Sequence, residues 1–164
     1  DVDYVRYSGK NKSTLSTTYP NAEDMATRPP QDVRNAMPSS IQIMAFKIDY
    51  VHPLAGGSRL ETGVKSSFVK ADNNTLFDTL KQESRVWMFD ASRSNHFLYD
   101  ESINAAYVNY AGTLGQSRLG KKLKVQAGLR AEHTHSVGNS LTLSQRVDRN
   151  YLNLFPTLFL SQQI

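Results

Sequence analysis

The stretch LKVQAGLRAEHTH, residues 123–135, decides the fold class because its side chains alternate in character. Successive side chains of a β-strand point to opposite faces of the sheet. The odd positions are mainly apolar and the even positions polar or small: Leu123, Val125, Ala127, Leu129, Ala131, His133 and His135 against Lys124, Gln126, Gly128, Arg130, Glu132 and Thr134. The stretch therefore predicts one long strand with an apolar face and a polar face, well beyond the about five or six residues of a mean strand.

Other segments of the chain show related patterns. Residues 41–52, 58–70, 103–114 and 151–163 are further candidate strands, and residues 1–8 are a possible sixth, as a stub. One face of these segments gathers apolar and small side chains: Met44, Phe46, Ile48 and Tyr50; Leu60, Thr62, Val64, Ser66 and Phe68; Leu152, Leu154, Leu158 and Leu160. Pro156 lies inside the last segment, which indicates an edge or a bulge. The sequence predicts an all-β, antiparallel up-and-down meander of five to six long strands.

The connections between these segments alternate in length. The turn PLAGG and the stretch GQSRLGKK are short, whereas residues 71–100 and 136–150 are longer, although residues 140–147 could simply continue two strands as a hairpin. Residues 9–40 are polar, and Pro29, Pro30 and Pro38 argue against regular strand pairing there. Short turns at one end and long loops at the other are typical of a membrane barrel. We expect residues 1–40 to be a long outward loop with a strand stub at its start, and residues 41–164 to be the barrel segment.

Alternation alone leaves two classes of protein open. A barrel wall has lipid on one side and a polar lumen on the other, whereas a soluble antiparallel sheet has one face on a core and one in water. Patterning alone slightly favours the soluble sheet, because Ser58, Thr62 and Ser66 dilute the apolar face. On that alternative the chain is a ligand-binding, for example carbohydrate-binding, module of the periplasm or cell surface.

Composition excludes several other classes. The 164 residues include no cysteine, so neither disulfides nor thiolate metal sites are expected. The net charge of +4 is modest and the basic residues are scattered among acids, which argues against a nucleic-acid partner. No apolar run approaches the ~20 residues of a membrane-spanning helix, and no signal peptide opens the chain. Because the sequence starts at Asp1 without a methionine, we interpret it as a piece of a longer protein.

Four ordered blocks carry a family resemblance. FKIDYVHPLAGGSRLETGVKSSFVKADN, RSNHFLYDESINAAYVNY, LKVQAGLRAEHTHSVGNSL and RNYLNLFPTLFLS resemble recurrent stretches of outer-membrane β-barrels of the TonB-dependent receptor type, closest to the barrel family abundant in Bacteroidetes. RNAMPSSIQI is similar to the loop exit of that family. The blocks cover most of residues 34–161. Any single block is weak, but four in order with suitable spacing are specific.

The resemblance implies an outer-membrane receptor that imports a nutrient with energy from a TonB-type protein. Barrels of that transporter class have about 22 strands and a plugged lumen. The implied partners are outer-membrane lipid, the rest of the barrel and its plug, the energy-coupling protein through segments not in this chain, and an unknown nutrient. Five or six strands are too few to close a barrel. We therefore expect the isolated segment to self-associate through an open edge, or to fold a long loop across it.

Candidate ligand contacts lie in the long loop before residue 100. Trp87, Arg93, His96 and Tyr99 offer ring faces that stack on sugars and groups that form hydrogen bonds with polar ligands. The alternative is that these side chains pack the loop or belong to an aromatic girdle at the membrane interface.

Three further pairs of side chains are structural candidates. His133 and His135 share a face with a spacing that suits a metal, but no third ligand is nearby, so no metal site is predicted. Arg130 with Glu132, and Glu61 with Lys65, lie on the polar face, where we expect cross-strand pairs or plug contacts. The sequence contains no catalytic constellation and no cofactor motif, so an enzyme is not predicted.

Overall fold

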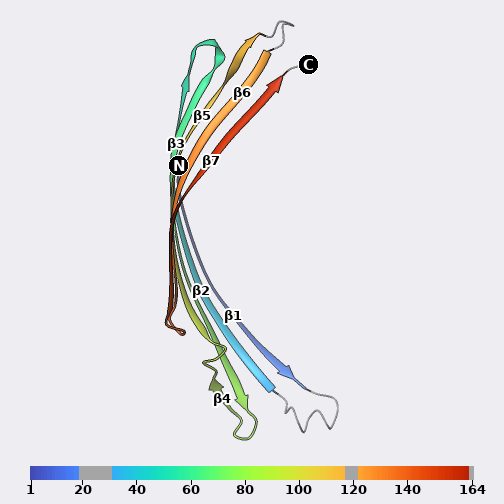
Figure 1. Ribbon diagram of the computed structural model, residues 1–164. Helices are drawn as coiled ribbons and strands as arrows, with labels where there is room; N and C mark the ends of the chain where they lie inside the picture. The colour runs from blue at the N-terminus through green and yellow to red at the C-terminus, as the bar shows by residue number, and fades with distance from the viewer. Residues whose placement is uncertain (19–30, 117–121, 163–164) are drawn as a thin grey trace.

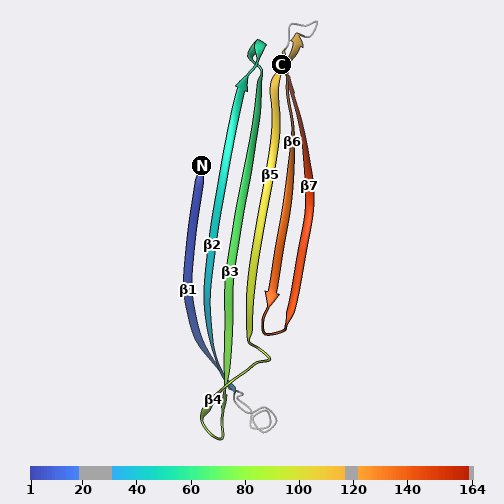
Figure 2. The same ribbon diagram turned by 90° about the vertical axis from the view of Figure 1, so that its left-hand side faces the viewer.

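The computed structural model describes residues 1–18, 31–116 and 122–162, which form one antiparallel sheet in a single bowed layer (Figure 1). The order of the long strands follows the chain, β1-β2-β3-β5-β6-β7, and the short strand β4 pairs with β3. A quarter turn shows the long strands side by side (Figure 2). The strands are β1 (Val2–Thr17), β2 (Gln31–Pro53), β3 (Arg59–Lys81), β4 (Val86–Phe89), β5 (Asn95–Gln116), β6 (Lys122–Ser140) and β7 (Gln145–Gln162). The predicted all-β meander is confirmed, with one short strand added.

The strands are longer than the alternation indicated. The stub expected at residues 1–8 is a strand of 16 residues. Strand β2 begins at Gln31 rather than near residue 41, and β3 continues to Lys81 into the region predicted as loop. Strands β6 and β7 meet at a tight turn after Ser140, which confirms that residues 140–147 continue the strands as a hairpin. Pro29, Pro30 and the centre of GQSRLGKK lie outside the described residues.

Pro38 shows how β2 accommodates a residue that was expected to prevent pairing. It lies opposite Lys10 in the ladder between β1 and β2. On the other side of β2, the ladder to β3 passes from the pair Ala36 and Leu76 directly to the pair Ser39 and Asn73. The pairing with β3 is therefore interrupted where the proline stands, while the pairing with β1 is continuous. Proline lacks a backbone N–H, and this interruption makes room for it.

The register places the apolar sets of all strands on one face, because residues directly opposite in a ladder share a face. Ile48 lies opposite Val64, Val64 opposite Ala106, and Ala106 opposite Ala131. Ala131 lies opposite Leu154, so this row crosses five strands. We call this side of the sheet the apolar face. The other side, the polar face, carries Lys47, Asp49, Lys65, Tyr107, Arg130 and Glu132.

The apolar face is exposed, because no second layer covers it in the described part of the chain. Among the described residues the buried hydrophobic ones are Val33, Ala105 and Val125, and of these the register places only Val125 on the apolar face. By contrast, Ile48 is 70% exposed and Leu152 is 63% exposed. Contiguous apolar surface of this extent on a soluble protein marks a contact with something other than water.

The two ends of the sheet differ in the connections between their strands. At one end, Leu54 donates its N–H to the carbonyl of Ser58 at 2.8 Å across a short turn. Its two glycines, Gly56 and Gly57, have φ of 74° and 76°, a left-handed conformation that a residue without Cβ adopts at little cost. At the opposite end lie the β3–β4–β5 connection and the β6–β7 turn.

The first and last strands of the sheet each have one paired side. Strand β1 pairs with β2 and β7 pairs with β6, and within the described residues no loop pairs along either outer edge. Pro156 stands in β7, in agreement with its predicted edge position. Across the described residues, no helix has the length and apolarity to cross a membrane.

Candidate functional site

A hydrogen-bonded cluster occupies the middle of the polar face. Lys47 Nζ lies 2.6 Å from Asp49 Oδ2, and the Tyr107 hydroxyl donates to Asp49 Oδ1 at 2.5 Å. Tyr107 is directly opposite Gly63, and a Cβ on that glycine would meet the Tyr107 ring and lie 2.6 Å from Asp49 Oδ1. The absence of a side chain at Gly63 lets the tyrosine cross β3 and reach the carboxylate on β2.

Other charges on the polar face pair within single strands. Arg130 Nη2 lies 2.8 Å from Glu132 Oε2, which confirms that these two side chains share a face. Arg59 Nε lies 2.6 Å from Glu61 Oε1, so Glu61 pairs two residues back along its own strand rather than with Lys65. Of the two expected outcomes, cross-strand pairs are not seen for these carboxylates, and plug contacts stay a prediction. Side chains two apart on a strand point the same way, which makes this short-range pairing easy.

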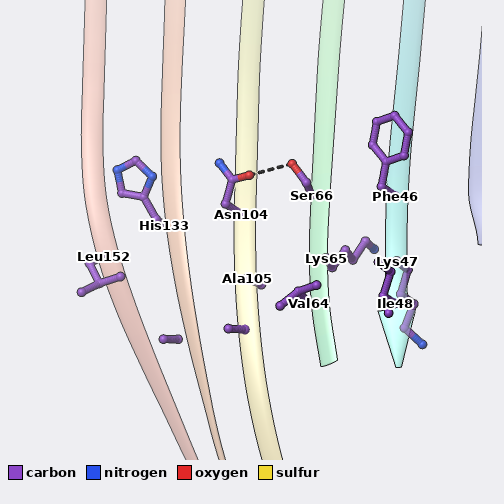
Figure 3. A pocket seen from close by; sticks show the side chains of 12 residues that line it. Phe46, Lys47, Ile48, Val64, Lys65, Ser66, Asn104, Ala105, His133 and Leu152 are labelled. Carbon is purple, nitrogen blue, oxygen red and sulfur yellow. Dashed lines mark hydrogen bonds between the residues drawn. The ribbon is translucent and has the colours of Figure 1, made fainter. Parts of the chain in front are cut away.

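A polar row crosses the apolar face above the apolar row of Ile48 (Figure 3). Ser66 Oγ donates to Asn104 Oδ1 at 2.6 Å, and His133 Nε2 lies 2.7 Å from Asn150 Oδ1. Figure 3 shows Ser66, Asn104 and His133 around a shallow depression of about 440 Å³, whose rim includes Phe46 and Leu152. On β5 and β6 this row marks where the apolar side chains give way to polar ones, whereas on β2 and β3 Met44 and Phe68 extend the apolar side chains by one more row.

The neighbouring histidine on β6 has a carboxylate partner. His135 Nε2 lies 2.9 Å from Asp148 Oδ1 on β7, and Arg146 Nη2 lies 3.5 Å from Asp148 Oδ2. No group of three or more metal-ligating side chains that could hold an ion is found among the described residues. The two histidines of the sequence motif therefore bond across to β7.

Trp87 lies on β4 at the far end of the sheet. Its ring is 4.7 Å from the guanidinium carbon of Arg34, a cation–π geometry. Arg34 Nε is 2.7 Å from Asp78 Oδ2, so β2, β3 and β4 are joined through these side chains. Sequence reasoning missed Arg34 and Asp78, because only the strand register brings residues so far apart in the chain together.

Asp90 organises the turn that contains Arg93. Its Oδ1 accepts hydrogen bonds from the Ser92 hydroxyl at 2.6 Å and from the Ser92 N–H at 3.0 Å. Arg93 Nε lies 3.5 Å from Asp90 Oδ2. The hydrogen bonds to Asp90, led by that of the Ser92 hydroxyl, hold the pKa of Asp90 below its ordinary value, because they favour the charged carboxylate. An aspartate followed by serines is a turn signal that the sequence could have supplied.

The two remaining candidates lie on opposite faces. His96 Nε2 bonds Asp72 Oδ1 at 2.8 Å on the apolar side of the sheet. The Tyr99 hydroxyl donates to Glu101 Oε2 at 2.6 Å on the polar side. His96 pairs with Asn74 and Trp87 with Leu80, so they are about 20 Å apart along β3. The structure does not bring the four predicted ligand contacts into one site.

The register, the two faces and the lack of a second layer over the described residues together fit a membrane β-barrel wall. The chain matches the outer membrane protein beta-barrel family over residues 1–164, and it belongs to that family. Its location is accordingly the outer membrane. No curated protein matches the chain.

Among solved structures, the chain resembles the ferric citrate transporter FecA in its unliganded form. The TM-score is 0.51 at 12% identity, over 96% of this chain and 22% of that one. At this identity the likeness shows the fold alone: an open antiparallel meander that matches part of a larger chain.

Proposed function

We propose that the chain is part of the membrane-spanning barrel of an outer-membrane receptor that imports a nutrient with energy supplied by a TonB-type protein. The carrying observation is the two-faced register, which sets an exposed apolar face against a hydrogen-bonded polar face. On this proposal the apolar face contacts lipid, and the polar face lines the lumen and contacts a plug. The role is structural rather than enzymatic.

The dimensions of the apolar face support this proposal. On β6 the apolar side chains run from Leu123 to the polar row at His133. Ten steps of about 3.3 Å give roughly 33 Å along the strand, or about 25 Å across a bilayer at a tilt near 40°. That equals the height of the apolar band of outer-membrane barrels, about 25 Å.

The soluble-module alternative has less support. A soluble sheet needs a core or a second layer over its apolar face. The described residues supply neither, since Leu154 and Leu158 are 60% and 66% exposed.

Lipid contact can be tested by single-cysteine spin labels, because the chain has no cysteine of its own. In the full-length protein reconstituted in vesicles, labels at Val125 and Leu129 should be accessible to oxygen in the lipid. Labels at Gln126 and Arg130 should be accessible to a water-soluble quencher. Equal accessibility of the two sets would overturn the wall assignment.

Import needs a separate test in cells that express the full-length protein. Uptake of iron chelates, vitamins and oligosaccharides should be compared with and without a working TonB-type protein. At least one compound should accumulate only when both proteins are present. A barrel that passes every compound equally in both strains would be a passive pore.

Trp87, Arg93, His96 and Tyr99 remain candidate ligand contacts within this proposal. They belong to the end of the sheet with the longer connections, which would face outward. Tyr99 lies on the polar face, which would line the lumen, so Tyr99 would contact a ligand inside the barrel. The other three would contact a ligand above the rim.

A further inference from the structure

A group of basic side chains stands directly above the apolar band on the apolar face of β1, β2 and β3. Arg6 lies opposite Gln42, and Gln42 lies opposite Lys70, so these three form one row. The row just below consists of Tyr4, Met44 and Phe68, which share the same face. Lys10 follows two rows farther out on β1. We call Arg6, Lys10, Lys70, Ser8, Ser40 and Gln42 the basic patch.

The cations of the basic patch have no acidic partner within ion-pair distance among the described residues. The ion pairs on this side of the sheet use other groups, such as Asp72 with His96 and Arg34 with Asp78. Asp100 is opposite Lys70 in the ladder and Asp72 is opposite Ser40, so two carboxylates border the patch. Asp72 is already bonded to His96. With respect to the described part of the chain, Arg6, Lys10 and Lys70 are therefore available for an anion, with the acids at one flank.

The surface around Lys10 is hollow. A depression of about 540 Å³ is lined by Ser8, Gly9, Lys10, Pro38, Ser39, Ser40, Asp72, Asn74 and His96. Asp72 is already bonded to His96, so the hydroxyl, amide and ammonium groups are what this hollow offers an anion. Hydroxyl and amide groups next to cations supply neutral hydrogen-bond donors, and phosphate oxygens accept these hydrogen bonds.

The height of the patch matches the headgroup region of a bilayer. One row, two residues, rises about 6.7 Å along a strand, or about 5 Å along the membrane normal at the usual tilt. Headgroups occupy roughly 5–8 Å on each side of the hydrocarbon. Arg6 and Lys70 fall in this zone, and the long side chain of Lys10 can reach down to it.

We propose that the basic patch binds the phosphate-bearing headgroup of a lipid in the outer leaflet, with its acyl chains on Tyr4, Met44 and Phe68. This inference rests on the proposed orientation, in which the end of the sheet with longer connections faces outward. It does not depend on import or on the energy-coupling protein, so a negative uptake result leaves it intact.

The test uses the full-length protein in detergent, titrated with bisphosphorylated lipid A and read out by native mass spectrometry. The variant R6Q/K10Q/K70Q should lose at least about tenfold in lipid retention, since each cation contributes attraction to anionic headgroups. The charge-preserving variant R6K/K10R/K70R should retain binding. Higher salt should weaken it.

A matched control changes the same charge on the polar face. The variant K65Q/K124Q/R149Q alters residues that the register places on that side, and it should bind lipid A like the parent. Equal losses in both neutralised variants, or no loss in either, would overturn the proposal. Heat-modifiable migration on gels verifies that each variant is folded.

Two further arms identify the source of the phosphate. Lipid A without phosphates should not be retained, and millimolar inorganic phosphate should not displace the bisphosphorylated lipid. Displacement by inorganic phosphate would replace the lipid site with a simple anion site. Preference for phosphatidylglycerol over lipid A would overturn the outer-leaflet assignment.

Discussion

Gly63 is the residue at which a single methyl group should change the polar face. A Cβ there would meet the Tyr107 ring, so Gly63→Ala must displace the ring and lengthen the Tyr107–Asp49 hydrogen bond of 2.5 Å. We expect a loss of about 1–2 kcal/mol in the free energy of unfolding. The measurement is urea unfolding of the full-length protein in vesicles.

A double-mutant cycle separates the hydrogen bond from other effects of Gly63. Tyr107→Phe removes the hydroxyl and keeps the ring. If Gly63→Ala acts through that hydroxyl, the double variant should lose less stability than the sum of the two single variants. Strict additivity would show that the ring position and the hydroxyl contribute independently.

Asp90 gives a pH prediction for the β4–β5 turn. Its folded-state pKa is lowered, first by the Ser92 hydroxyl, so the carboxylate stabilises the turn above its unfolded pKa of 3.8. This stabilisation is lost as the pH falls through the lowered folded-state value. Ser92→Ala should raise the pKa of Asp90 toward its ordinary value, measured by NMR titration of the carboxyl carbon. An unchanged pKa in that variant would contradict the assigned cause.

At the scale of one strand, we expect the same substitution to have different costs in stability on the two faces of β6. Leu129 lies near the middle of the apolar band and is 45% exposed. Leu129→Lys should cost about 2–4 kcal/mol of stability in a bilayer, because a charge at the midplane is destabilising. Gln126→Lys, on the polar face of the same strand, should cost far less. Urea titrations of both variants in vesicles give the comparison, and equal costs would mean that β6 does not separate lipid from lumen.

The sequence predicts the face of each side chain only in the part of a strand that has different surroundings on its two sides. In residues 123–131 the alternation is regular, and the structure places Val125, Leu129 and their neighbours on one face as expected. Strand β2 between Gln31 and Ser40 has no such alternation, because a strand that projects beyond the bilayer meets water on both sides. In such a stretch Pro38 indicates a loop, and only the interrupted ladder to β3 explains its place in a strand.

The candidate ligand site was less predictable than the fold. The residue types of Trp87 and Tyr99 point to ligand contact, but a residue type says nothing about the face on which its side chain falls. Their partners, Arg34 and Glu101, follow from register and from spacing along the strand, respectively. The family resemblance, by contrast, depends on ordered blocks along the chain, and the match over residues 1–164 agrees with it.

At the scale of the whole molecule, the open edges lead to a prediction about association. Strands β1 and β7 each leave one row of backbone groups unpaired in the described sheet, and unpaired edges are templates for other strands. The apolar face adds exposed Leu152, Leu158 and Leu160 beside one edge. We therefore expect the 164-residue segment alone to form oligomers in plain buffer or to require micelles.

Light scattering with and without micelles measures this association, with the full-length protein in the same detergent as the control. The longer protein should be of one size in micelles, because further strands would pair with β1 and β7. A stable monomer of the segment in plain buffer would require its apolar face to pack internally, in an arrangement unlike this single layer. That result would show that the segment alone does not keep this single layer. Lipid and the neighbouring strands of the barrel would then be required to hold the sheet open.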